Sequence, residues 1–114
     1  MSAADCLMCR IVAGEITPDI VARTDTSIAF RDINPQAPTH VLVIPNRHVA
    51  NAAELAADAA ELQDVLALAA SVAEQEGLSD GYRLVFNTGA TAGQSVFHAH
   101  LHVLGGRAMA WPPG

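Results

Sequence analysis

The sequence has no lysine, and its six basic residues are all arginines set singly along the chain, against 12 acidic residues. The net charge at pH 7 is -6. A surface that binds nucleic acid or anionic lipid without sequence specificity needs clustered positive charge. The composition therefore argues against a nucleic-acid partner and against a membrane partner, and it leaves room for one small anionic ligand held by local donors. The lack of lysine also removes any internal lysine as a target of adenylation.

Long hydrophobic runs and a secretory signal are lacking as well. No apolar run approaches the length that spans a bilayer, and the N-terminus MSAADCLMCR has no basic flank followed by an apolar stretch. Only 16% of residues are charged and 51% are hydrophobic, so the chain can bury a core. We expect a cytoplasmic protein with a single domain over residues 1–114.

Cysteine is scarce, with Cys6 and Cys9 the only two. In a reducing compartment, a pair separated by two residues indicates metal ligation or redox chemistry before it indicates a structural disulfide. The spacing alone does not choose between metal and redox chemistry.

The secondary structure expected from the sequence is mixed. Strand-like composition or alternation occurs at 20–24, 27–31, 40–45, 82–87 and 96–104. Helical spacing occurs over 5–13 and over 58–76, where Asp58 and Glu61 are placed like a capping box and Gly77 follows the end. Because most strands follow one another without a helix between them, we predict an α+β fold. It has a five-stranded antiparallel sheet with one long and one short helix.

Residues 97–103 (FHAHLHV) alternate apolar side chains with His98, His100 and His102. This is the period of a strand with one buried face, so we expect the three imidazoles to share the other face. Burying three such groups without partners would be costly, which indicates that they line a cleft. Two alternatives are water-exposed strand histidines and a three-histidine metal site of the hydrolytic type.

The segment before the histidines, residues 88–95 (TGATAGQS), is predicted to be a loop. Gly89 and Gly93 allow its backbone to approach a ligand and to direct N–H groups at ligand oxygens, and Ser95 adds a hydroxyl. A loop of this kind that leads directly into the histidine strand favours phosphate chemistry over metal hydrolysis.

Together the loop and the histidines read GQSVFHAHLHVL, which resembles the histidine triad (HIT) family, whose mark is His-φ-His-φ-His-φ-φ. The ending from GGR at 105–107 to WPPG at 111–114 is similar to that of its Hint branch, the nucleoside phosphoramidases. The resemblance includes FRDI at 30–33 and PQAPTH at 35–40, and it runs over residues 6–114. It implies a HIT-like sheet that continues across a homodimer.

The resemblance implies a mechanism in which His100 attacks the α-phosphorus of a purine nucleotide, such as AMP or GMP in a phosphoramidate. A covalent nucleotidyl-histidine forms and is released by water. A neutral imidazole is nucleophilic near pH 7, and two steps avoid direct attack of water on an anionic centre. By the same resemblance His102 contacts the phosphate, Ser95 relays a proton to the leaving group and His40 supports that transfer.

The resemblance also assigns the nucleotide-binding residues. Asp32 matches the residue that accepts hydrogen bonds from both ribose hydroxyls, a role suited to a carboxylate. Met8 stands where many Hint proteins carry an aromatic residue. The full set is Leu7, Met8, Ile11, Phe30, Asp32, Ile33, Asn87, Gly93, Gln94, Ser95, His100 and His102. Without the resemblance, Asp32 is read as a turn cap, Phe30 and Ile11 as core, and Ser95 as a loop hydrogen bond.

Cys6 and Cys9 resemble those HIT proteins that bind zinc through two cysteines and two histidines, and the matching histidines are His48 and His98. Two thiolates and two imidazoles give a closed tetrahedral Zn²⁺ site without net charge, suited to structure and not to activating water. Zn²⁺ is thus the expected structural cofactor, and the chemical step needs none. The alternative is a pair of reduced thiols packed in the core.

Hydrolysis of adenosine or other purine 5′-phosphoramidates is the leading function, favoured by Ser95 and by the ending at 111–114. One alternative is hydrolysis of dinucleoside polyphosphates, as in the Fhit branch. A second is a nucleotide-sensing interaction module with incidental turnover. A third is a zinc-dependent hydrolase with the metal bound by the triad.

Overall fold

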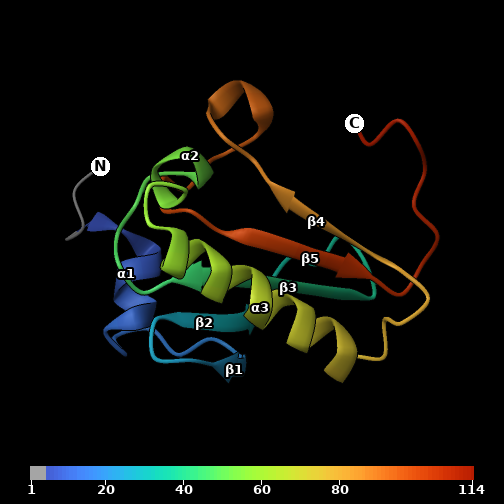
Figure 1. The fold of residues 1–114 in the computed structure, drawn as a ribbon, viewed down its shortest axis with the longest axis horizontal. Coiled ribbons are helices and arrows are strands. Elements are labelled where there is room, and N and C mark those ends of the chain that lie inside the picture. Colours follow the sequence, from blue (N-terminus) through green and yellow to red (C-terminus); the bar gives the residue numbers. More distant parts are fainter. Residues whose placement is uncertain (1–4) are drawn as a thin grey trace.

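The computed structural model describes residues 5–114; the first four residues of the N-terminal segment discussed above lie outside that range. The elements are α1 (Leu7–Val12), β1 (Ile20–Arg23), β2 (Ser27–Arg31), β3 (Thr39–Pro45), α2 (Ala52–Leu55), α3 (Ala59–Gln75), β4 (Tyr82–Phe86), the 3₁₀ turn η2 (Ala90–Ala92) and β5 (Leu101–Gly105). Figure 1 shows α3 lying across one face of the sheet, with α1 beside one end of β2 and β3.

The strands form one sheet in the order β1-β2-β3-β5-β4, and every neighbouring pair is antiparallel. The predicted α+β class and the five-stranded antiparallel sheet are confirmed. β1 and β4 are the two edges of this sheet. The chain enters β5 between β3 and β4, which brings the histidine segment beside His40.

Alternation along the central strands builds two cores, one on each face. Val41, Val43, Leu101 and Val103 pack under α3. On the other face a second core joins α1 to the strands: Cys6, Met8, Ile11, Ile28, Phe30, Leu42 and Ile44. Because side chains alternate along a strand, His102, which pairs in register with Leu42, lies on the α1 face. The α1 face therefore carries the candidate site.

The long helix begins and ends as predicted. Asp58 caps it by accepting the Glu61 N–H at 3.0 Å, and Gly77 follows with φ +74°. Asp64, on the same helix, also explains the β1–β2 hairpin. Its Oδ2 accepts hydrogen bonds from the Thr24, Thr26 and Ser27 hydroxyls, which stabilise a turn that contains no glycine.

The predicted strand at 96–104 is wrong at its start, because β5 begins only at Leu101. Backbone groups of the preceding segment bond outside any ladder. The Ala99 N–H donates to the Val49 carbonyl at 2.8 Å, and the Val96 carbonyl accepts from the Gln94 side chain at 3.0 Å. The structure also adds α2, a one-turn helix capped by Asn51, which is too short to produce a periodic pattern.

Within residues 5–114, no helix combines the length and the apolar composition needed to cross a bilayer.

Candidate active site and metal centre

A cavity of about 370 Å³ opens between α1, β2 and the segment that leads into β5. Eight of the twelve predicted nucleotide-binding residues line it: Leu7, Met8, Ile11, Phe30, Asp32, Ile33, Ser95 and His100. Asn87, Gly93, Gln94 and His102 do not. The lining combines one apolar side with a carboxylate, a hydroxyl and an imidazole, which is the composition expected of a small-molecule site.

His100 has its tautomer fixed by the backbone. Its Nδ1 lies 2.8 Å from the His98 carbonyl oxygen. A carbonyl oxygen only accepts, so Nδ1 must carry the proton. In the neutral ring Nε2 then keeps its lone pair, which is the arrangement that a nucleophilic imidazole requires.

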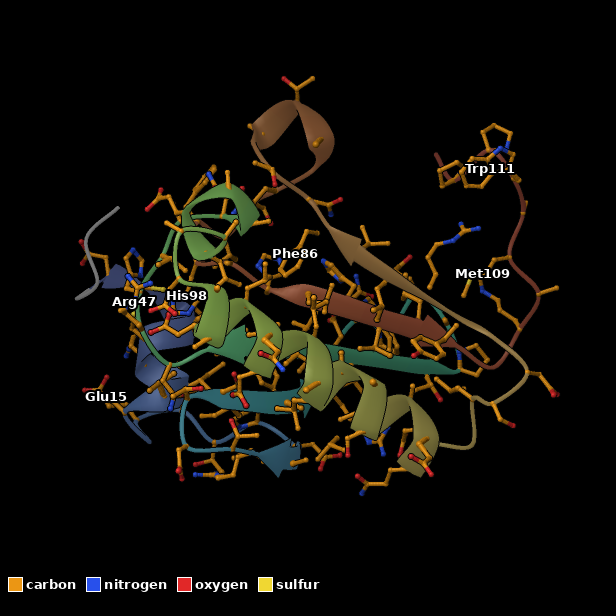
Figure 2. The ribbon with its side chains drawn as sticks, in the orientation of Figure 1. Glu15, Arg47, Phe86, His98, Met109 and Trp111 are labelled. Atoms are coloured by element: carbon orange, nitrogen blue, oxygen red, sulfur yellow. The ribbon has the colours of Figure 1, made fainter. Side chains whose placement is uncertain are left out.

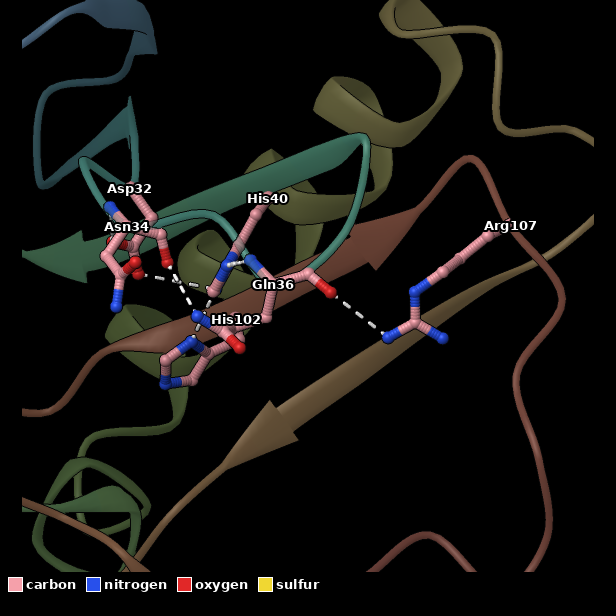
Figure 3. Close-up of polar contacts among 6 residues, drawn as sticks. All are labelled: Asp32, Asn34, Gln36, His40, His102 and Arg107. Carbon is pink, nitrogen blue, oxygen red and sulfur yellow. Dashed lines mark hydrogen bonds and ion pairs between the residues drawn. The ribbon is translucent and has the colours of Figure 1, made fainter.

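His102 has the opposite tautomer, and Figure 3 shows why. The Gln36 N–H donates to His40 Nδ1 at 3.0 Å, so the proton of His40 is on Nε2. His40 Nε2 lies 2.9 Å from His102 Nδ1 and donates to it. The proton of His102 is therefore on Nε2, which is buried and has no hydrogen-bond partner among residues 5–114. An unpaired buried donor of this kind would be stabilised by an anionic oxygen.

Burial keeps the rings of His40 and His102 neutral. It lowers the pKa of His102 to about 4, with further lowering from the neighbouring His100 and His40. Burial also lowers the pKa of His40, and nearby Asp32 opposes that effect. The ring centroids of His100 and His102 are 5.1 Å apart, and those of His40 and His102 are separated by the same distance. Neutral rings in contact avoid the repulsion that two imidazolium ions would suffer.

Asp32 lies beside this chain of hydrogen bonds. Its Oδ2 is 3.4 Å from His40 Nε2, and its Oδ1 accepts the Asn34 N–H at 2.9 Å. The carboxylate, His40 and His102 are close enough together to surround a metal. However, the Gln36 N–H occupies the lone pair of His40 Nδ1 and leaves a proton on Nε2, so His40 has no lone pair for a metal. These contacts instead fix which ring nitrogen of His40 and of His102 carries the proton.

His98 does not join the other two imidazoles of the segment, so the prediction of one shared face is wrong for this ring. His98 is fully buried, and its Nε2–H donates to the Pro45 carbonyl at 2.8 Å. Its Nδ1 faces Cys6 Sγ and Cys9 Sγ, each at 3.5 Å. A metal held jointly by the three histidines of the segment is not compatible with this arrangement.

Cys6, Cys9, His48 and His98 form the cluster predicted to hold zinc, and their ligand atoms all lie within 4.8 Å of one another. Cys9 Sγ is 3.3 Å from His48 Nδ1. In a tetrahedral site, Zn–S and Zn–N bonds place sulfur and nitrogen roughly 3.6 Å apart. The measured separations fit this geometry, and the Pro45 carbonyl orients His98 as outer partners of metal-binding histidines do.

The charge state of the cluster without a metal is also informative. Burial raises the pKa of the Cys9 thiol to about 11, with a smaller contribution from Cys6. Both cysteines are free thiols. A zinc ion bound here would displace the Cys9 proton, because a coordinating thiol is deprotonated.

The loop before β5 is held by Gln94. Its Oε1 accepts the Gly89 N–H at 2.9 Å, and its Nε2 donates to the Ala50 and Val96 carbonyls at 2.7 and 3.0 Å. Gly89 and Gly93 have φ of +88° and +99°, a region that favours glycine. An ideal Cβ on Gly93 would lie 3.9 Å from Asn87 Nδ2. Gln94 and both glycines therefore shape the loop that presents Ser95.

Comparison with known proteins decides the family. The HIT domain model matches residues 13–109. The chain belongs to the HIT family.

Among its HIT relatives, the chain is 45% identical to a purine nucleoside phosphoramidase of Escherichia coli over 94% of this chain and 92% of that protein. It is 49% identical to a 14 kDa zinc-binding protein of Zea mays, over 92% of this chain and 84% of that protein. The crystal structure of a HIT family hydrolase from Legionella pneumophila superposes with a TM-score of 0.92 at 49% identity, covering 96% of this chain and all of that one.

Several groups at this HIT site carry no signal in the sequence. The Gln36 N–H, the Pro45 carbonyl and the His98 carbonyl set the tautomers of three histidines, and every residue type supplies such groups. Only the fold shows which of them meet an imidazole. The lining residues Ile16, Thr17 and Pro18 were also missed, because they belong to the connection between α1 and β1.

We expect acid to destabilise this HIT domain partly through His102. Between pH 6.5 and about 4 the unfolded chain binds a proton at His102 and the folded chain does not. The free energy of unfolding therefore falls as pH is lowered through this window, by up to about 1.4 kcal/mol per pH unit from this group. Urea unfolding of His102→Gln should show a shallower pH dependence than the unmodified protein. Val85→Ala, which alters the cross-strand neighbour of His102, should keep the full slope; equal slopes in all three would contradict the assignment.

Proposed function

We propose that this protein hydrolyses purine nucleoside 5′-phosphoramidates, such as AMP or GMP joined to an amine, through a covalent nucleotidyl-His100. The observation that carries the proposal is the tautomer of His100 at the cavity. Its Nδ1–H is donated to the His98 carbonyl, which leaves the Nε2 lone pair for attack on phosphorus. The similarity to the purine nucleoside phosphoramidase of E. coli supports the same substrate class.

In the first step the Nε2 of His100 forms a bond to the α-phosphorus while the bond from phosphorus to the amine nitrogen breaks. The His98 carbonyl stabilises the positive charge that develops on the ring. Ser95, which shares the cavity with His100, relays a proton from water to the departing amine. In the second step the water that gave its proton through Ser95 attacks phosphorus as hydroxide, the bond from phosphorus to Nε2 breaks, and the nucleotide leaves with neutral His100 restored.

Binding is divided among the other groups of the site. Asp32 is assigned to the ribose hydroxyls, and the apolar lining from α1 and Phe30 to the purine. The unpaired Nε2–H of His102 is assigned to a phosphate oxygen. His40 is buried with both ring nitrogens already in hydrogen bonds, so we assign it to orienting His102 and not to direct contact with the leaving group.

We also assign a structural Zn²⁺ to Cys6, Cys9, His48 and His98. The four ligands, the near-tetrahedral separations and the second bond of His98 support it. When bound, the ion would link α1 to the segment before β5 and would not activate water, because all four positions are filled. Reduced thiols in such a site are consistent with a cytoplasmic location.

The partner that we propose for the chain is a second copy of itself. β4 is an edge strand, so one side of its backbone has no strand beside it. Tyr82 and Leu84 on β4, and Leu66 on α3, are each about two-fifths exposed. Trp111 is 83% exposed, and Figure 2 shows it on the segment that leads away from the sheet. Pairing of two β4 strands would cover this edge and continue the sheet across the dimer.

The nucleophile is tested with His100→Ala. We expect turnover of an AMP-amine substrate to fall by roughly 10³-fold or more, because no other group supplies the covalent step. AMP binding should change little, since ribose, purine and phosphate contacts lie elsewhere. Rapid quenching of the unmodified protein should trap an acid-labile nucleotidyl-histidine at position 100. Near-normal turnover by the variant would overturn the mechanism, and faster turnover of dinucleoside polyphosphates than of phosphoramidates would overturn the substrate assignment.

The zinc site is tested by metal analysis of protein purified without chelator, where we expect one zinc per chain. Cys9→Ala should lose the metal and lower the free energy of unfolding by about 3 kcal/mol or more, because structural zinc contributes directly to folding. Arg10→Ala, on the same helix with an exposed ion pair to Glu15, should change stability by no more than about 0.5 kcal/mol. A metal-free protein as stable as one loaded with zinc would refute the site.

The dimer is tested by light scattering of two variants that place the same charge on the two sheet edges. Leu84→Glu on β4 should yield a folded monomer, because like charges would face each other across the interface. Arg23→Glu on β1, the other edge, should remain dimeric. A monomeric unmodified protein at micromolar concentration would be the contrary result.

A further inference from the structure

The C-terminal segment makes an unusually close contact with the loop that joins β2 to β3. Gly106, directly after β5, has φ +91°, and a Cβ built on it would lie only 2.8 Å from Pro38 Cβ. No other residue type fits this approach without moving Pro38. The next residue, Arg107, donates from Nη2 to the Gln36 carbonyl at 3.1 Å (Figure 3). The turn at Gly106 thus places the Arg107 side chain beside the loop.

The loop itself has few anchors. Residues 33–36 are exposed, and Ile33 is 96% exposed. Within the loop, the Asn34 N–H bonds to Asp32 and the Gln36 side chain bonds to the Asn34 carbonyl. Two side chains outside the loop bond to Gln36, namely Arg107 at its carbonyl and His40 at its N–H. Exposed segments with little buried surface open at low cost, so each anchor matters.

We propose that Arg107 is a positioning residue that holds Gln36 on His40 and thereby keeps the proton of His102 on Nε2. Arg107 does not touch the cavity, and it acts through three hydrogen bonds in series: to Gln36, from Gln36 to His40, and from His40 to His102. The effect on the His102 tautomer is a property of the free protein. Its effect on turnover rests on the proposed function.

The order of donors and acceptors along these hydrogen bonds explains how losing the bond to Gln36 would affect His102. If Gln36 moves away, His40 Nδ1 loses its donor, and the proton is held on Nε2 only by Asp32 Oδ2, at the longer distance of 3.4 Å. His40 can then accept at Nε2, and His102 can move its own proton to Nδ1 to donate there. His102 Nε2 would then face a phosphate oxygen with a lone pair, which repels that oxygen where the N–H would bind it.

The test compares two arginines that both donate to backbone carbonyls. Arg107→Ala removes the bond to Gln36. Arg83→Ala removes a bond of 2.8 Å to the Ala110 carbonyl of the same C-terminal segment and leaves the loop untouched. Because Arg83 lies on the proposed dimer edge, light scattering should first confirm an unchanged assembly state for both variants.

The first readout is the ¹⁵N NMR spectrum of ligand-free, histidine-labelled protein, which distinguishes protonated from unprotonated ring nitrogens. The unmodified protein and Arg83→Ala should both show His102 with a protonated Nε2 and an unprotonated Nδ1. In Arg107→Ala both nitrogens should shift toward intermediate values, as expected of exchanging tautomers. Unchanged His102 signals in Arg107→Ala would overturn the proposal.

The second readout is turnover of an AMP-amine substrate. Arg107→Ala should lower kcat by about threefold to tenfold, the size of one net hydrogen bond, with a smaller change in KM. In a His40→Ala background the same substitution should have no further effect, because the link that it uses is gone. Equal losses in both backgrounds would overturn the proposal. If no phosphoramidate is turned over and the NMR result holds, the proposed function fails and the positioning role stands.

Discussion

The position of His98 is the constraint on which the rest of the site depends. The carbonyl of this residue accepts the Nδ1–H of His100. Its own Nδ1 faces the two cysteines, and its Nε2–H donates to the Pro45 carbonyl. One residue therefore belongs to the proposed zinc cluster and also fixes the tautomer of His100, the proposed nucleophile. His98 thus contacts both Cys6, the residue directly before α1, and the ring of His100.

Backbone groups orient His100 and His40, and His40 in turn orients His102. A carboxylate beside His100 would favour its charged form and so reduce the fraction with a free lone pair. The peptide carbonyl of His98 fixes the tautomer without placing a full negative charge beside the ring. Burial has a similar result at His102, whose low pKa keeps it neutral next to its neighbours. His40 and His102 thus lie close together without either carrying a charge.

The sequence predicted the parts of the structure that depend on repeated patterns. The cap and apolar stripe of α3 and the presence of five strands were found in this way. Eight residues of the cavity were found instead through the resemblance to the HIT family, and Ile16, Thr17 and Pro18 were missed. Where single contacts decide, prediction failed: the alternation at 97–103 extended β5 too far toward its start, because the backbone of 96–99 bonds to a side chain, a ring and a distant carbonyl. The role of the Gln36 N–H could not be predicted, since no side chain marks it.

The buried amide of Gln94 has a consequence for the thermodynamics of ligand binding. It ties the two ends of the glycine loop to each other and to the segment before α2, and only 3% of the residue is exposed. A glycine loop without such a tie would have to give up backbone freedom when a phosphate arrives, at about 1–2 kcal/mol for each residue fixed. Here that loss is already incurred during folding. Association of the proposed nucleotide should therefore show little unfavourable conformational entropy from the loop. Its heat-capacity change should reflect mainly the apolar surface that the base covers.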